Sequence, residues 1–113
     1  MVEIVNKSRD FSEVEIYLMT ISPAIISMKD VSDGEKIKVD GYVIFNDIND
    51  KGEETEIMSI ITPDKKVYCF QSATFKRSFM DIYNIMHGKE FCIVKTSGET
   101  KAGRPYINCW LDI

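Results

Sequence analysis

The chain has 113 residues, of which 44% are hydrophobic, and this composition suits one globular domain with its own core. No apolar run approaches the roughly 20 residues that a membrane helix needs. The charged N-terminal stretch lacks the apolar segment of a signal peptide. We therefore expect a single domain over residues 1–113 that stays in the cytoplasm, with no membrane partner.

The net charge is −4 and the pI is near 5.0, which argues against general affinity for nucleic acid. The charge is unevenly spread, however. Acidic residues concentrate in residues 1–35 and again in residues 47–56, whereas residues 95–104 carry Lys95, Lys101 and Arg104 against Glu99. This last segment is the most positive short stretch of the chain.

The N-terminal third is predicted to contain an arm, a strand and a short helix. Residues 1–12 are expected to be a loose arm, and residues 13–21, with their β-branched and aromatic side chains, to form a strand. Ser22 and Pro23 are typical of a helix start, with serine as N-cap and proline at the first helical position. The predicted helix covers residues 23–31.

The segment of residues 36–47 alternates as a strand does. One predicted face carries Ile37, Val39, Val43 and Phe45. The opposite face carries Lys36, Lys38, Asp40 and Tyr42. Gly41 interrupts the strand, and a glycine at such a position marks a bulge, a bend or a close backbone approach.

Two further strands and a helix follow. A polar loop over residues 46–54 leads to a strand over residues 55–62, and a turn leads to a strand over residues 66–71. The short connections predict an antiparallel meander. Ser72 is a suitable N-cap for a helix over residues 73–86, on which one face is apolar. The last two strands are predicted over residues 90–95 and 106–113, with the basic segment between them.

Three strands, one helix and two strands form the element order of a five-stranded Greek-key barrel of the OB type. We therefore predict a mainly β fold of this kind, with the helix between strands three and four and a short N-terminal helix. Gly41 would let the first strand curl and pair on both sides. An ordinary α+β sandwich has the same element order and remains an alternative.

In OB barrels, nucleic acid lies across the second and third strands, between the loop after strand one and the loop after strand four. The basic segment would be the second of these loops. Binding of single strands requires positive groups for phosphates and aromatic faces for bases. The candidate DNA-binding residues are Lys38, Tyr42, Tyr68, Phe70, Lys95, Lys101, Arg104, Tyr106 and Trp110.

Each of these signals has an ordinary structural explanation as well. A glycine-containing basic loop is often a solvated turn. Strand aromatics usually belong to the core, which applies to Phe70 in particular. Tyr106 and Trp110 would alternatively cover the helix or form a dimer contact. The acidic loop over residues 46–54 would repel phosphate.

No pattern in the chain predicts an enzyme, a cofactor or a metal site. The cysteines Cys69, Cys92 and Cys109 are widely spaced inside apolar runs, which favours buried thiols over a disulfide framework or a zinc site. The segment that begins at Asp47 resembles a calcium loop, but Met58 stands where such a loop needs its bidentate glutamate. The single histidine, at position 87, falls in a predicted helix-ending turn.

The segments "SPA", "DGEKIKVDGYVIFND", "TF" and "KTSGETKAGRPYINC" together resemble the small single-stranded DNA-binding proteins of tailed phages and mobile elements of Gram-positive bacteria. The resemblance runs from about Ser22 to Cys109, and its most specific part is Ser97-Gly98 followed by residues 101–106. It implies an OB-type fold, sequence-independent binding of single-stranded DNA, and possible replication or recombination proteins as partners. Glu99 stands where the resemblance leads us to expect a further lysine.

The second hypothesis is a small β-barrel module for protein–protein contact or homo-oligomerisation, without nucleic-acid binding. Outward-facing aromatic side chains would form its contact surface, and it would account directly for the acidic composition. An enzyme is the third and weakest hypothesis.

Overall fold

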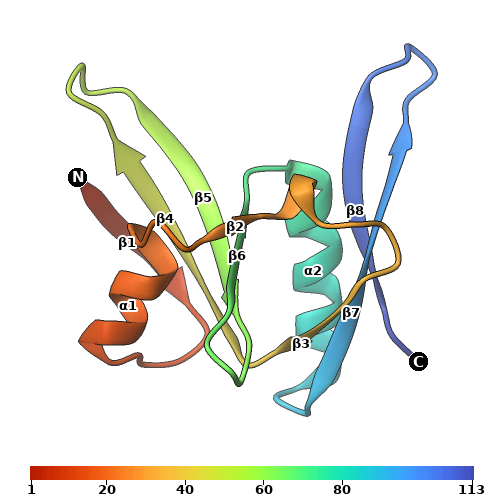
Figure 1. Cartoon of the computed structure of the whole chain (residues 1–113), viewed down its shortest axis with the longest axis horizontal. Helices are drawn as coiled ribbons and strands as arrows, with labels where there is room; N and C mark the ends of the chain where they lie inside the picture. Colours follow the sequence, from red (N-terminus) through yellow and green to blue (C-terminus); the bar gives the residue numbers. More distant parts are fainter.

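The computed structural model describes residues 1–113 as two β-sheets and two α-helices (Figure 1). The larger sheet has the order β1-β4-β5-β6-β2 and the smaller one the order β3-β7-β8. Their strands are β1 (Val2–Lys7), β2 (Ile26–Ser27), β3 (Lys36–Val39), β4 (Gly41–Ile48), β5 (Glu54–Ile61), β6 (Val67–Phe70), β7 (Phe91–Glu99) and β8 (Pro105–Leu111). The helices are α1 (Glu13–Thr20), α2 (Ala73–Met86) and the short 3₁₀ turn η1 (Met28–Asp30). The mainly β prediction is confirmed, but the two sheets do not close into a barrel.

Gly41 is the point at which one continuous segment leaves one sheet and enters the other. β3 pairs antiparallel with β7, whereas β4 pairs with both β1 and β5. A Cβ atom on Gly41 would lie 2.8 Å from the ring of Phe11. Of the three alternatives expected at this glycine, a close approach is the one observed, and the group that approaches is the aromatic side chain of Phe11.

The alternation of residues 36–47 changes phase at this break. Ile37 and Val39 face the larger core cluster as predicted, but after Gly41 the residue that faces it is Tyr42. The predicted outward position of Tyr42 is wrong, because the turn between the sheets shifts the inward set by one residue. Val43 instead packs on the opposite side of the sheet, in a second cluster that includes Met19 of α1.

The N-terminal third differs from its prediction throughout. The expected loose arm forms β1, which pairs antiparallel with β4. The expected strand over residues 13–21 is α1, which begins with a capping box: the Ser12 hydroxyl accepts from the Glu15 backbone N–H at 3.2 Å, and the Glu15 carboxylate accepts from the Ser12 N–H at 3.0 Å. The expected helix over residues 23–31 is replaced by β2 and η1.

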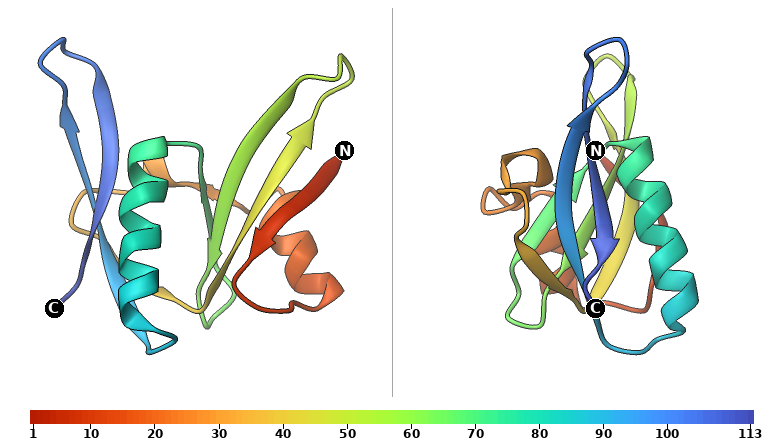
Figure 2. Two further views of the ribbon diagram at one scale, coloured as in Figure 1. Left: turned by 180° about the vertical axis from the view of Figure 1, so that it is seen from behind. Right: turned by 90° about the vertical axis from the view of Figure 1, so that its right-hand side faces the viewer.

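The helix predicted over residues 73–86 is present as α2. The Ser72 hydroxyl accepts from the Phe75 backbone N–H at 3.1 Å, and His87 ends the helix in the left-handed conformation. Figure 2 shows α2 between the two sheets, and its Phe75 and Phe79 are fully buried in a core cluster to which strands of both sheets also contribute. α2 thus fills the space between the sheets. Neither α-helix has the length and apolar character that a membrane span requires.

Glu15 couples the stability of α1 to pH. The Ser12 N–H donates to its carboxylate and the Lys65 ammonium lies 2.9 Å away, and these contacts lower the pKa of Glu15 from 4.5 to about 2. Because the folded-state pKa lies below the unfolded-state value, this contribution to stability is present above about pH 4.5 and is lost as the pH falls toward about 2. We expect Glu15→Gln, which keeps the capping acceptor, to show a shallower decline of the unfolding midpoint over that range.

Thermal unfolding followed by circular dichroism from neutral to acidic pH measures this decline. Glu13→Gln is the matched control, since it removes one exposed carboxylate from the same helical turn. An acid profile of Glu15→Gln that coincides with that of the unaltered protein would contradict the assignment.

Candidate nucleic-acid interface

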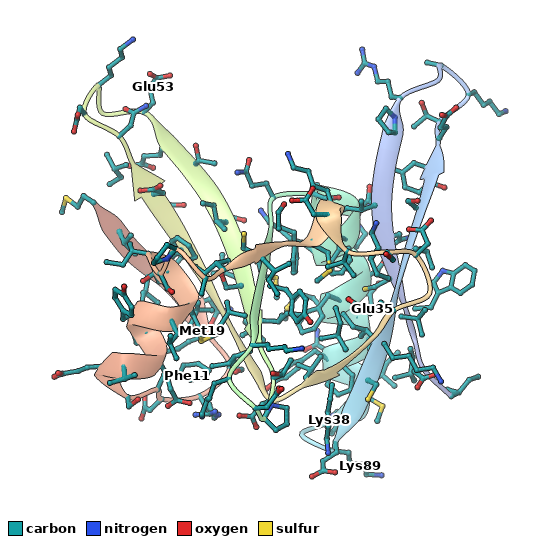
Figure 3. All side chains as sticks on the ribbon, viewed as in Figure 1. Phe11, Met19, Glu35, Lys38, Glu53 and Lys89 are labelled. Carbon is teal, nitrogen blue, oxygen red and sulfur yellow. The ribbon has the colours of Figure 1, made fainter.

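Two long hairpins project toward the same end of the molecule and splay apart (Figures 1 and 2). The β4–β5 hairpin carries Glu53 at its tip, as Figure 3 shows. The tip of the β7–β8 hairpin is closed by two bonds, from the Thr100 N–H to the Arg104 carbonyl and from the Gly103 N–H to the Thr100 carbonyl, each 2.9 Å long. Gly103 has a φ of 80°, which favours glycine. Lys101 and Arg104 are exposed at this tip and form no ion pair.

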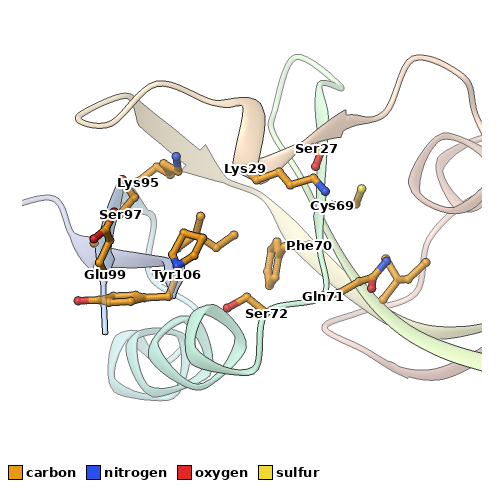
Figure 4. A pocket seen from close by; sticks show the side chains of 14 residues that line it. Ser27, Lys29, Cys69, Phe70, Gln71, Ser72, Lys95, Ser97, Glu99 and Tyr106 are labelled. Atoms are coloured by element: carbon orange, nitrogen blue, oxygen red, sulfur yellow. The ribbon is translucent and has the colours of Figure 1, made fainter. Parts of the chain in front are cut away.

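A groove lies at the base of the β7–β8 hairpin, in the gap where β6 and β8 do not pair (Figure 4). It is an open cavity of about 910 Å³. One wall is formed by the hairpin, the floor by the end of β6, and the other wall by the connection through β2 and η1. The main lining residues are Ser27, Lys29, Cys69, Phe70, Gln71, Ser72, Lys95, Ser97, Glu99, Tyr106 and Ile107.

Lys29 is a groove residue that the sequence did not identify. It is exposed, forms no ion pair, and its side chain is directed toward Cys69 rather than toward the β7–β8 hairpin (Figure 4). Burial raises the pKa of the Cys69 thiol, and the nearby Lys29 ammonium offsets part of that rise. The sequence interpretation placed Lys29 in a helix over residues 23–31, whereas the structure has β2, which pairs with β6, and η1 in that segment.

Lys95 was predicted to contact phosphate, and its position argues against that role. Its side chain is only 5% exposed. The ammonium donates to the Val31 carbonyl at 2.7 Å and lies 3.1 Å from the Asp33 carboxylate. A cation that is already desolvated and neutralised in this way has little charge left for a phosphate in the groove.

Three aromatic side chains among the candidate DNA-binding residues are core residues. The expected outward positions of Tyr42 and Tyr68 are wrong, and for Phe70 the core alternative holds. Tyr42, Tyr68 and Phe70 are each at most 7% exposed. The Tyr42 ring packs edge-on against Phe79 with ring centroids 5.9 Å apart, and the Phe70 ring lies 4.3 Å from that of Phe75. Phe70 still contributes to the groove floor, but its faces are not free to stack with a base.

Tyr106 and Trp110 share one face of β8, as their spacing predicts, and Ile107, Cys109 and Leu111 pack toward the core on the other. That shared face is the outer side of the β3-β7-β8 sheet. Trp110 is 65% exposed opposite Val94 and does not line the groove. Tyr106 reaches the groove because it stands at its edge, where its ring lies against Gly98.

Lys38 also lies on this outer face, opposite Cys92. Its ammonium is 3.5 Å from the Glu90 carboxylate. Figure 3 shows Lys38 at the end of the molecule away from the hairpin tips. The structure therefore does not bring Lys38 to the groove.

The acidic β4–β5 loop is a self-contained turn. The Asn49 side-chain oxygen accepts from the backbone N–H groups of Lys51 and Glu53, at 2.9 and 3.0 Å. This supports the plain-loop interpretation over a calcium loop. No group of three or more histidine, cysteine, aspartate or glutamate side chains is placed to hold a metal ion.

No protein-family model, curated protein or solved structure matches this chain. Of the predicted residues, Tyr106 lines the groove, whereas Lys101 and Arg104 lie at the tip of the same hairpin and outside the groove lining. The structure adds Lys29 on the opposite wall.

Gly98 and Tyr106 are cross-strand partners, and the glycine makes room for the ring. A Cβ atom on Gly98 would lie 2.7 Å from the Tyr106 hydroxyl oxygen. We expect Gly98→Ala to displace the ring and lower the free energy of unfolding in the unaltered chain. In a Tyr106→Ala background the same change should be neutral, or stabilising by up to about 1 kcal/mol, since alanine costs less backbone entropy than glycine.

Urea unfolding of the four proteins in this double-mutant cycle measures the coupling between the two residues. Equal effects of Gly98→Ala in both backgrounds would show that the ring does not rest on the glycine.

Proposed function

We propose that this protein binds single-stranded DNA without sequence preference, along the groove at the base of the β7–β8 hairpin. The observation that carries the proposal is a groove with one free lysine on its wall, flanked by a hairpin whose tip carries two further free cations. Lys29 stands on one wall, and Lys101 and Arg104 stand at the tip of the hairpin that forms the other. Tyr106 lies on the same hairpin, 39% exposed.

The strand pairings support an OB-type arrangement. β3 and β4 act as one long first strand that is shared by the two sheets, followed by β5, β6, α2, β7 and β8. A closed OB barrel would require its third and fifth strands, here β6 and β8, to pair as well. In this chain they flank an open groove of about 910 Å³ instead.

The charge distribution favours a path along the β7–β8 side. Lys29, Lys101 and Arg104 supply phosphate contacts, and the exposed face of Tyr106 supplies a stacking surface worth about 1–3 kcal/mol per base. The β4–β5 tip carries Asp50 and Glu53, which repel phosphate. The acidic β4–β5 hairpin thus limits the path of the DNA strand on one side. It also disfavours binding of a duplex, which presents a broader phosphate surface.

The proposed biological setting is replication or recombination of phage or mobile-element DNA, in the host cytoplasm. It rests on the resemblance of the segment from Ser22 to Cys109 to small DNA-binding proteins of that source. Proteins that replicate or recombine DNA are the partners that this setting proposes.

Salt dependence tests the proposal directly. Fluorescence anisotropy with end-labelled oligo-dT, at several salt concentrations between about 50 and 200 mM, gives the slope of log K against log salt. On single strands each lost phosphate contact reduces that slope by about 0.7. Lys101→Ala combined with Arg104→Ala should therefore weaken binding and reduce the slope by about 1.4.

Lys66→Ala combined with Lys89→Ala is the matched control, since it removes two exposed lysines that lie away from the groove and form no ion pair. The control should leave the slope unchanged. Absence of binding by the unaltered protein at any salt concentration would overturn the proposed function. If both double variants reduced the salt slope equally, Lys101 and Arg104 would have no specific role in the proposed binding.

The second candidate function is a protein-contact or self-association module, and Trp110 is the observation that favours it. A tryptophan that is 65% exposed on a sheet face turned away from the groove is typical of an interface. Analytical ultracentrifugation together with the oligo-dT titration, applied to the unaltered protein and to Trp110→Ser, distinguishes the candidates. DNA binding in the groove predicts equal oligo-dT affinity for both proteins, whereas the interface candidate predicts an oligomer that Trp110→Ser disperses.

A further inference from the structure

Lys95 is a buried cation that lies between β7, in one wall of the groove, and the segment after η1, which carries the other wall. It follows Phe91 and Ile93 on the inward-facing side of β7, and its side chain is 5% exposed. Its ammonium nonetheless has good partners: the Val31 carbonyl at 2.7 Å and the Asp33 carboxylate at 3.1 Å. The second Asp33 oxygen accepts from the Ser97 hydroxyl at 2.5 Å.

The backbone strengthens the same connection. The Gly34 N–H donates to the Lys95 carbonyl at 2.8 Å, and the Lys95 N–H donates to the Glu35 carbonyl at 3.1 Å. Residues 31–35, which we call the strap, therefore lie along β7 and are held by both side-chain and backbone bonds. Figure 3 shows Glu35 on this strap, beside the smaller sheet. The Ser97 hydroxyl and the Lys95 ammonium also lower the pKa of Asp33, which keeps its carboxylate charged.

The strap connects the two walls of the groove. It follows η1, which carries Lys29, and it is tied to β7, which continues into the hairpin with Lys101 and Arg104. Both Lys95 and Ser97 line the groove where this tie is made (Figure 4). Loss of the tie would let the hairpin and the Lys29 wall move relative to each other.

We propose that Lys95 is a positioning residue for single-strand binding: together with Asp33 it fixes the β7–β8 hairpin against the wall that carries Lys29, and it does not contact phosphate. This inference rests on the proposed function, because one of its tests measures binding of single-stranded DNA. The opposite role makes different predictions. If Lys95 reached phosphate, its removal would reduce the salt slope, and removal of the Asp33 carboxylate would free the ammonium and strengthen binding.

The experiment compares Lys95→Met and Asp33→Ala in the oligo-dT salt titration. We expect each to weaken binding by about tenfold, the scale of one charged hydrogen bond, with the salt slope unchanged. Lys36→Met is the matched control. It removes an exposed lysine of the same sheet, whose ammonium lies 3.5 Å from the Asp112 carboxylate, and it should change neither affinity nor slope.

Amide hydrogen exchange of the DNA-free proteins provides a readout that does not depend on DNA binding. We expect Lys95→Met and Asp33→Ala to accelerate exchange at Gly34 and along residues 96–106, while β4 and β5 keep the protection of the unaltered protein. Asp33→Ala serves as the milder variant, because it truncates a half-exposed side chain and leaves the buried lysine its carbonyl partner.

The outcomes separate the two proposals. Tighter binding by Asp33→Ala, or a slope reduced by about 0.7 in Lys95→Met, would overturn the positioning role and restore Lys95 as a phosphate contact. Unchanged exchange along the hairpin in both variants would overturn it as well. Failure of the unaltered protein to bind oligo-dT, with exchange altered as expected, would overturn the proposed function and leave the tie as a structural one.

Discussion

The fold depends on the passage of one segment from the smaller sheet to the larger one at Asp40 and Gly41. The Asp40 backbone N–H donates to the Ile61 carbonyl at 2.8 Å, and its carboxylate accepts from Arg9 at 2.9 Å, while the Phe11 ring lies against Gly41. Both sheets thus share one anchored strand. One part of this segment, β4, belongs to the β4–β5 hairpin, and the other part, β3, pairs with β7 of the β7–β8 hairpin. The two hairpins splay apart, β6 and β8 do not pair, and the groove lies in the gap between them.

Burial on both sides of the larger sheet restricts where a ligand can bind. One side of β4 and β5 faces α2 through Met58 and Ile60, and the other faces α1 through Val43 and Ile61. An OB-type protein offers the outer face of its second and third strands to nucleic acid. In this chain α1 packs on one side of β4 and β5 and α2 on the other, and the open groove lies beside β6.

The elements that the sequence predicted well are those whose local signals agree with one another. For α2, the Ser72 cap, the apolar stripe and the glycine after His87 all mark the same boundaries. The N-terminal third lacks that agreement: residues 13–20 are rich in β-branched and aromatic side chains, but the Ser12–Glu15 capping box and the packing of Met19 decide for a helix. The capping box was visible in the sequence, whereas the packing was not.

The site was predicted only in part, because charge and strand parity gave conflicting indications at Lys95. Its parity with Phe91 and Ile93 places it inward, whereas its charge alone suggested an exposed phosphate contact. A lysine at a core position is stable only where fixed acceptors replace water, and Val31 and Asp33 provide them. Those acceptors come from a segment 60 or more residues earlier, as the 64-residue separation of Lys95 and Val31 shows. Local sequence patterns carry no information about such a contact, and the same buried lysine that misled the prediction is the group that joins the two walls of the groove.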